Sequence, residues 1–239
     1  MSQAIKEFSR FAYQYDKYNE IQSEVAKKLV SQIPIKSYEC IIDVGCGSGE
    51  VYKNIKKNGI HTIKFIALDS SEEMLSLHPN NIDVEKLIAN FNHQNIFNKL
   101  SLSSETLMVS SSALQWSTDL DFTFSQLAKQ AKEAYFAIFT ANTFKTLHKA
   151  AGIQSPIYEE EILKDKIQKY YYADFELIKY RLEFETIREM FTYIKKSGVS
   201  GGERQLTYQK IKALMNEYPL KYLEFEVLFV RATSLAKSK

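Results

Sequence analysis

The chain is poor in the residues that hold small or metal-dependent proteins together. Of its 239 residues only two are cysteine, eight are glycine, four are proline and one is tryptophan. Cys40 and Cys46 lie on either side of one short apolar run, so a disulfide would have to span an extended strand, and no second pair offers metal-ligand spacing. We therefore expect both thiols to be reduced and no metal centre to be present.

Long apolar runs and a strong charge of one sign are also absent. No stretch approaches the roughly 18 continuous apolar residues of a membrane span, and residues 1–7 lack the basic-then-apolar pattern of a secretion signal. The formal net charge is only +2, although basic residues are frequent between residues 164 and 212. A solvated surface explains most of them, and a local basic patch for an acidic partner is the alternative. We expect a cytoplasmic protein that binds neither membrane nor nucleic acid.

What is present is the composition of an ordinary globular protein, 45% hydrophobic and 25% charged, long enough for one large domain. Apolar runs alternate with amphipathic stretches. This pattern predicts strands over 40–44, 64–68, 84–89, 106–110 and 134–139, and helices over 50–58, 71–77 and 121–132. Strands separated by helices indicate a parallel, doubly wound sheet.

Two segments fall outside this alternation. Residues 5–33 carry apolar side chains at helical spacing and are followed by Pro34, which predicts an N-terminal helix. From 144 to 174 the pattern is helical and charged, which predicts an inserted cap over one edge of the sheet. Further strands are predicted over 176–184 and 222–231, and further helices over 186–196 and 208–217. We expect one domain over 1–239, with a helical lid over 1–34 and the cap over 144–174.

The most informative feature is a glycine-rich run between the first predicted strand and helix. In Asp43-Val44-Gly45-Cys46-Gly47-Ser48-Gly49 the glycines let the backbone turn sharply and approach a ligand that a side chain would exclude. About twenty residues further on, a second strand ends in Asp69, where mononucleotide-binding βαβ units carry a carboxylate for ribose hydroxyls. The alternatives are a tight structural turn for the glycines and a helix cap for Asp69.

The spacing of the glycines distinguishes between cofactor classes. Nicotinamide and flavin nucleotides are held by G-x-G-x-x-G, whereas this loop is G-x-G-x-G preceded by an aspartate. It resembles the nucleotide-binding loop of class I S-adenosylmethionine-dependent methyltransferases. The resemblance implies an α/β fold with a Rossmann-like, doubly wound sheet of seven mostly parallel strands, an N-terminal helix and an inserted helical cap, and it implies S-adenosylmethionine as the cofactor.

The same resemblance indicates further positions of the cofactor site. An acid after the third strand usually accepts from the adenine amine; here Asn90 offers an amide oxygen and Phe91 an apolar face, unless both belong to an ordinary loop. Trp116, after the fourth strand, either walls the pocket or belongs to the core. The expected cofactor-binding residues are Tyr15, Asp43, Gly45, Cys46, Gly47, Gly49, Asp69, Ser70, Asn90, Phe91 and Ser110.

A narrower resemblance rests on four further motifs, one of which is Phe139-Thr140 with Leu147-His148-Lys149-Ala150 downstream. Together with this motif, Phe8-Ser9-Arg10-Phe11-Ala12-Tyr13-Gln14-Tyr15-Asp16, Ala113-Leu114-Gln115-Trp116 and Ile194-Lys195-Lys196-Ser197-Gly198 resemble the malonyl-[acyl-carrier protein] O-methyltransferases of biotin synthesis, and the similarity extends from about residue 8 to residue 231. It implies methyl transfer to the free carboxylate of a malonyl thioester, with an acidic acyl carrier protein as partner. We expect the enzyme to be a monomer.

Such a reaction asks for positioning rather than proton transfer. The carboxylate is ionised at neutral pH, so alignment with the sulfonium methyl and exclusion of water suffice, and we expect no acid–base pair. The resemblance places Tyr15 at the methyl-transfer face and makes His148 and Lys195 candidates for holding the carboxylate or thioester. Core packing is the alternative for Tyr15, and a surface position is the alternative for the other two.

Other functions remain open at this point. One is a methyltransferase of a small free acid such as trans-aconitate. Another is a non-catalytic domain that binds S-adenosylmethionine to regulate a partner. A nucleic-acid methyltransferase is disfavoured because an N-P-P-Y-type loop is absent after the fourth strand.

Overall fold

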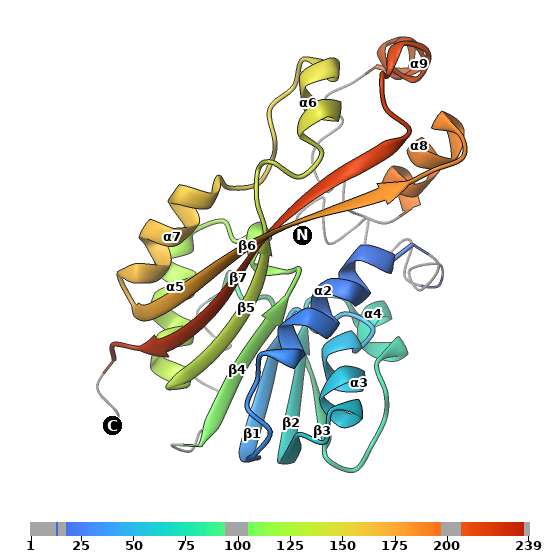
Figure 1. Cartoon of the computed structure of the whole chain (residues 1–239). Coiled ribbons are helices and arrows are strands. Elements are labelled where there is room, and N and C mark those ends of the chain that lie inside the picture. The colour runs from blue at the N-terminus through green and yellow to red at the C-terminus, as the bar shows by residue number, and fades with distance from the viewer. Residues whose placement is uncertain (1–12, 14–17, 94–104, 197–206, 237–239) are drawn as a thin grey trace.

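The computed structural model describes residues 13, 18–93, 105–196 and 207–236 of the chain. Its described strands form one seven-stranded sheet in the order β3-β2-β1-β4-β5-β7-β6 (Figure 1). The strands are β1 (Ser37–Val44), β2 (His61–Asp69), β3 (Val84–Ile88), β4 (Thr106–Ser111), β5 (Glu133–Phe139), β6 (Tyr171–Glu183) and β7 (Tyr222–Ser234). The first five run parallel, and β7 is antiparallel to both β5 and β6. The predicted doubly wound α/β sheet is confirmed.

Helices cover both faces of this sheet (Figure 1). They are α2 (Glu20–Ser31), α3 (Glu50–Lys57), α4 (Glu72–Leu77), α5 (Leu120–Gln130), α6 (Lys145–Ala151), α7 (Glu160–Gln168), α8 (Ile187–Lys196) and α9 (Tyr208–Glu217). Of the predicted N-terminal helix, α2 lies within the described residues, whereas residues 1–12 and 14–17 lie outside them. No helix in the described part of the chain is long and apolar enough to cross a membrane.

The central strands are buried on both sides. Ile41 of β1 belongs to one apolar cluster with α2 and α3, and its neighbour Ile42 belongs to a second cluster with α5 and α7. Phe65 and Ile66 repeat this alternation in β2. Strands covered on both faces are continuous apolar runs in the sequence, which is why they could be predicted from it.

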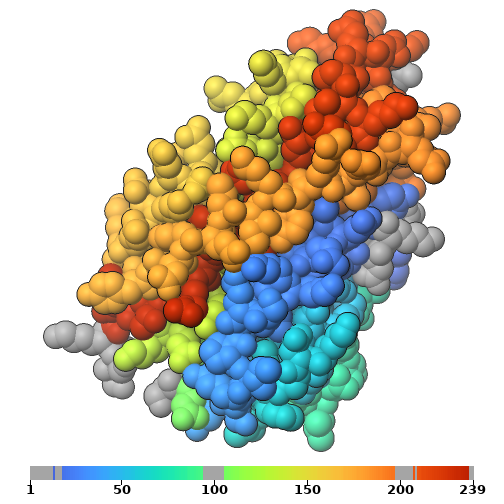
Figure 2. Space-filling view, in the orientation of Figure 1, coloured from blue at the N-terminus to red at the C-terminus, as the bar shows by residue number. Residues whose placement is uncertain are grey.

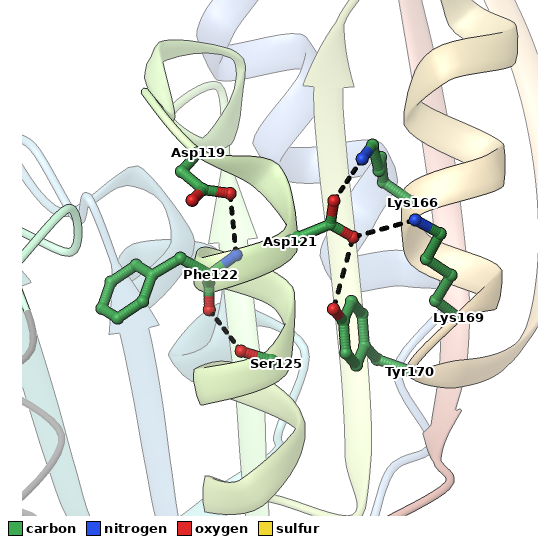
Figure 3. A network of polar contacts seen from close by, with 7 residues as sticks. All are labelled: Asp119, Asp121, Phe122, Ser125, Lys166, Lys169 and Tyr170. Atoms are coloured by element: carbon green, nitrogen blue, oxygen red, sulfur yellow. Dashed lines mark hydrogen bonds and ion pairs between the residues drawn. The ribbon is translucent and has the colours of Figure 1, made fainter.

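The predicted cap over 144–174 is not one structure. It comprises α6, α7 and the first residues of β6. Leu163 and Ile167 bury α7 against the face of the sheet beside α5. At the surface, Asp121 of α5 accepts hydrogen bonds from Lys166, Lys169 and Tyr170 (Figure 3). Within the predicted cap, α7 therefore uses its apolar stripe for packing on the face of the sheet.

The strands β6 and β7 continue beyond the rest of the sheet (Figure 1). They pair along their whole length, from Tyr171 opposite Ser234 to Glu183 opposite Tyr222, whereas β5 pairs with residues 227–233 of β7. The extended part supports α8, whose buried Tyr193 contacts Phe225 of β7. The strand β6 also lies along α2 (Figure 2). There the side chains of Lys28 and Gln32 of α2 donate hydrogen bonds to the carboxylate of Glu176 of β6.

Candidate active site

A cavity lies where the order of the parallel strands reverses, between β1 and β4. Residues 45–48, 69–71, 90–92 and 111–113 line it, together with Gln22, Ala26, Glu50, Val51, Met74 and Trp116. These are the segments that follow β1, β2, β3 and β4, closed by one side of α2. In open α/β sheets this reversal leaves a crevice at the carboxyl ends of the strands, which is the usual ligand position.

The glycine loop after β1 is packed tightly against its neighbours. Gly45 has a φ of +74°, and a Cβ placed on it would lie 2.2 Å from the Cβ of Ala113. Gly49 has a φ of +90°, and its Cβ would lie 2.7 Å from Pro79 and 2.8 Å from His78. Only glycine fits either position, since both the backbone conformation and the contact exclude a side chain. Gly49 does not line the cavity; it allows α3 to start against the residues after α4.

His78, which a side chain at Gly49 would meet, is buried. Its Nδ1 donates to the carbonyl of Pro79 at 3.0 Å, and its ring packs against Tyr52 and Phe65. Burial lowers the pKa of His78 from its usual 6.5. The folded protein therefore binds a proton here less readily than the unfolded chain, so stability from this group is present above pH 6.5 and is lost as the pH falls below it.

We expect the wild type to lose up to about 1.4 kcal/mol of unfolding free energy per pH unit relative to His78→Gln on acidification below that pH. Urea unfolding of both proteins at a series of pH values measures this difference. Both proteins contain the same carboxylates, so the contribution of these groups to the pH dependence cancels in the difference. Parallel pH profiles would show that His78 does not titrate as inferred.

Asp69 joins the glycine loop to the end of β2. Its Oδ2 accepts from the amide of Gly47 and its Oδ1 from the amide of Ser71, both at 2.9 Å. The amides of Gly45 and Cys46 both donate to the carbonyl of Leu68. The N-cap of α4 is Ser71, which accepts from Met74. Each oxygen of Asp69 retains capacity for a further donor, and the carboxyl lines the cavity.

Asp43 lies underneath this loop rather than in the cavity. It is completely buried, and neither carboxylate oxygen has a hydrogen-bond partner within the described residues. Burial, with a smaller contribution from the negative charge of Asp69, raises the pKa of Asp43 well above its usual range. Asp43, one of the expected cofactor-binding residues, therefore does not line the cavity and forms no hydrogen bond to the loop amides in the described part of the chain, and a neutral carboxyl is favoured there.

The turn after β3 is fixed by its own asparagines. Asn90 and Phe91 line the cavity at the predicted positions. The side-chain oxygen of Asn90 accepts from the amide of Asn92 at 2.9 Å, and that of Asn92 accepts from the amide of Thr118 at 2.8 Å. Asn92 was not predicted, because its role depends on a contact with the loop after β4 that no local pattern indicates.

The serine run after β4 differs from the prediction by one residue. Ser110 is buried and donates to the carbonyl of Val44 at 2.7 Å, so it joins β4 to β1 and does not line the cavity. Ser111 and Ser112 line it instead. Successive side chains of a strand point to opposite sides of the sheet. Because the three serines are identical, no local pattern indicates which of them lies beneath the loop.

Of the predicted substrate residues, His148 and Lys195 do not line the cavity. Tyr15 lies outside the described residues. His148 is half-buried on α6 beside Phe144 and does not line the cavity. Lys195 is exposed at the end of α8. Its neighbour Lys196 instead donates to the hydroxyl of Tyr18 at 3.2 Å, just before α2 begins.

The charge of the cavity favours a cationic ligand. Among its described lining residues the ionisable side chains other than Cys46 are Glu50 and Asp69, and none is lysine, arginine or histidine. Glu50 accepts from Ser23 of α2 at 3.1 Å and pairs with Lys53 at 2.7 Å. A compound with a sulfonium, an ammonium and ribose hydroxyls fits this lining, since cations and hydroxyl donors meet carboxylates there.

Comparison with known proteins agrees with this fold. Residues 35–190 match a family model described as a methyltransferase domain, and the chain belongs to this family. It is an S-adenosylmethionine-dependent methyltransferase. Among named relatives, the chain is 28% identical to the malonyl-[acyl-carrier protein] O-methyltransferase of Acetivibrio thermocellus, over 95% of this chain and 88% of the relative. It is 23% identical to the protein of that name from Priestia megaterium, over 89% and 88%.

Solved structures show the same fold at low identity. A methyltransferase in complex with the Haloferax volcanii Trm112 methyltransferase activator superposes with a TM-score of 0.62 at 14% identity, covering 95% of this chain and 97% of that one. Phosphoethanolamine N-methyltransferase 2 of Haemonchus contortus, solved with S-adenosyl-L-methionine, gives 0.56 at 13% identity, covering 94% and 57%.

Proposed function

We propose that the protein transfers the methyl group of S-adenosylmethionine to the free carboxylate of malonyl-acyl carrier protein, a step of biotin synthesis. The observation that carries the proposal is the extent of the similarity to relatives of that name, 89% and 95% of this chain. This similarity therefore extends to segments of the chain that lie outside residues 35–190, which match the family model.

The residues of the cavity give the proposed cofactor contacts. Asp69 would accept from the ribose hydroxyls, and Asn90 and Phe91 would contact the adenine. Residues 45–48 and Ser70 would border the rest of the nucleoside. Tyr15 remains our candidate for the methyl-transfer face. When bound, the cofactor supplies an electrophilic methyl group on a sulfonium, and the chain has to hold the carboxylate in line with it and exclude water.

The surface charges suggest where an acidic carrier protein would bind. Many basic residues of the C-terminal half are already paired with acids of the same chain, for example Lys166 and Lys169 with Asp121 (Figure 3). In the described part of α8 and α9, Arg188, Lys195 and Lys210 have no ion-pair partner. We therefore propose α8 and α9 as the docking side for the carrier protein, by electrostatic attraction.

The test is methyl transfer followed by mass spectrometry. Incubation with S-adenosylmethionine should add one methyl group to malonyl-acyl carrier protein, and acetyl-acyl carrier protein, which lacks the free carboxylate, should remain unchanged. Free malonate and trans-aconitate are assayed beside them. Faster methylation of a free acid than of the carrier-bound one would contradict the proposal, and so would cofactor binding without turnover of any acid.

A further inference from the structure

The end of β4 and the loop that follows it carry three hydrogen-bond donors without a partner among the described residues, on residues that line the cavity. The hydroxyls of Ser111 and Ser112 and the indole N–H of Trp116 are shielded from solvent and form no hydrogen bond within the described residues. All three residues line the cavity. Buried polar groups in folded proteins are nearly always hydrogen-bonded, so three orphaned donors on cavity-lining residues indicate a ligand-binding position.

The backbone that carries these groups is fixed in place. Ser112 has a φ of +60°, which is uncommon for a residue with a side chain. Its amide donates to the carbonyl of Ala137 at 2.8 Å, and its own carbonyl accepts from the side chain of Gln115 at 2.7 Å. A strained conformation held from both sides is typical of residues that are pre-positioned for a ligand.

Charge separates the two ends of the cavity. The acids Glu50 and Asp69 belong to the segments after β1 and β2, whereas the orphaned groups lie at the end of β4 and in the loop after it. In the sheet, β1 lies between β2 and β4, so the ends of β2 and β4 are not adjacent. Residues 110–118 contain no acidic side chain. The charge of Glu50, after β1, is paired with Lys53, so an anion is repelled mainly by Asp69 at the β2 side and finds neutral donors at the end of β4.

We propose that Ser111, Ser112 and Trp116 form the subsite for the carboxylate of the acyl substrate; this rests on the proposed function. Their donors hold one carboxylate oxygen and leave the other free to react. That oxygen forms the new bond to the methyl carbon while the carbon–sulfur bond breaks with its electron pair left on sulfur, and no proton is transferred. Neutral donors suit this chemistry because they orient the anion without removing its charge.

Trp116 makes the test direct, since it is the one tryptophan of the chain. Its fluorescence is followed while the protein, saturated with S-adenosylhomocysteine, is titrated with malonyl-pantetheine. The Ser111→Ala/Ser112→Ala variant should bind malonyl-pantetheine about 10- to 100-fold more weakly, as expected for lost hydrogen bonds to a charged group. Its affinity for S-adenosylhomocysteine should stay unchanged, which also shows that it is folded.

Two controls separate the possible outcomes. Ser125→Ala, which removes a hydroxyl bonded to the carbonyl of Phe122 on α5 (Figure 3), should behave like the wild type. The methyl ester of malonyl-pantetheine, which lacks the negative charge, should bind the wild type and the double variant with equal affinity. An equal loss of S-adenosylhomocysteine affinity in the double variant would assign the serines to the cofactor and overturn the subsite, and so would unchanged malonyl affinity.

Failure of the proposed function gives a different result. If the wild type neither binds malonyl-pantetheine nor methylates the malonyl carrier, the malonyl assignment is wrong. The same titration with trans-aconitate then tests the subsite alone. Loss of its binding in the double variant would retain the carboxylate subsite for another acid, and binding that is independent of the serines, or absent in the wild type, would overturn it.

Discussion

Replacing Gly45 by alanine should abolish measurable cofactor binding. The new Cβ would lie 2.2 Å from that of Ala113, at a residue whose φ is +74°. Neither side can move freely, because the amide of Gly45 is bonded to Leu68 and Ser112 is bonded to Ala137. The clash therefore separates the walls contributed by β1 and β4. We expect affinity for S-adenosylhomocysteine to fall more than about 100-fold, as calorimetry would show, with a cost of about 2–5 kcal/mol in stability from strain and overpacking.

The matched control is Gly59→Ala. Gly59 has nearly the same φ, +69°, but a Cβ there would meet nothing within 4 Å. This variant should carry the backbone strain alone, about 1–2 kcal/mol, and bind the cofactor normally. Thermal unfolding and calorimetry of the two variants separate strain from contact. Normal cofactor affinity in Gly45→Ala would show that the loop does not form the site.

The second large effect is expected for Asp69→Asn. The carboxylate accepts from the amides of Gly47 and Ser71, one on each oxygen. An asparagine turns one of these acceptors into an NH₂ group, which then faces an amide N–H in either orientation. The amide donor left unpaired lowers stability with or without cofactor, whereas the weaker bonds to the ribose cost about 3 kcal/mol of binding free energy, which is about a 100-fold loss of cofactor affinity.

Asp83→Asn is the matched control for Asp69→Asn. Asp83 lies just before β3, where its carboxylate accepts from Tyr52 and pairs with Lys56, and it does not line the cavity. Its replacement should lower the melting temperature without changing the affinity for S-adenosylhomocysteine. Equal affinity losses in the two variants would mean that Asp69 acts through stability and not through the ribose.

Much of the fold could be predicted because its signals are local. The apolar runs of β1, β2 and β5 and the helix α9 were predicted to within a few residues. The start of β6 was predicted at residue 176, whereas the strand begins at Tyr171. Its first residues continue a charged, helix-like stretch, and they become a strand because Ser234 and the preceding residues of β7 pair with them. Such pairing between distant segments leaves no periodic signal in either one.

The residues of the candidate site could likewise be predicted only where their signal is local in the sequence. The glycine loop and Asp69 were found because strand, turn and helix follow one another in the sequence. The lining at the end of β4 was not found, because it depends on which neighbouring residue faces inward. Ser110 was predicted where Ser111 and Ser112 line the cavity, and Lys195 was predicted where Lys196 reaches Tyr18. A shift of one residue reverses the direction of a side chain on a strand and turns it by about 100° on a helix.

The place of β7 has a consequence for biosynthesis. This strand, residues 222–234, is made after all other described strands, yet it lies between β5 and β6. Until it leaves the ribosome, β5 lacks one neighbour and β6 has none among the described strands. Nascent chains therefore carry an open sheet edge, which is prone to aggregation. We expect this sheet to be completed only once β7 has left the ribosome, so that chains that stall or terminate before it are the ones that need chaperones.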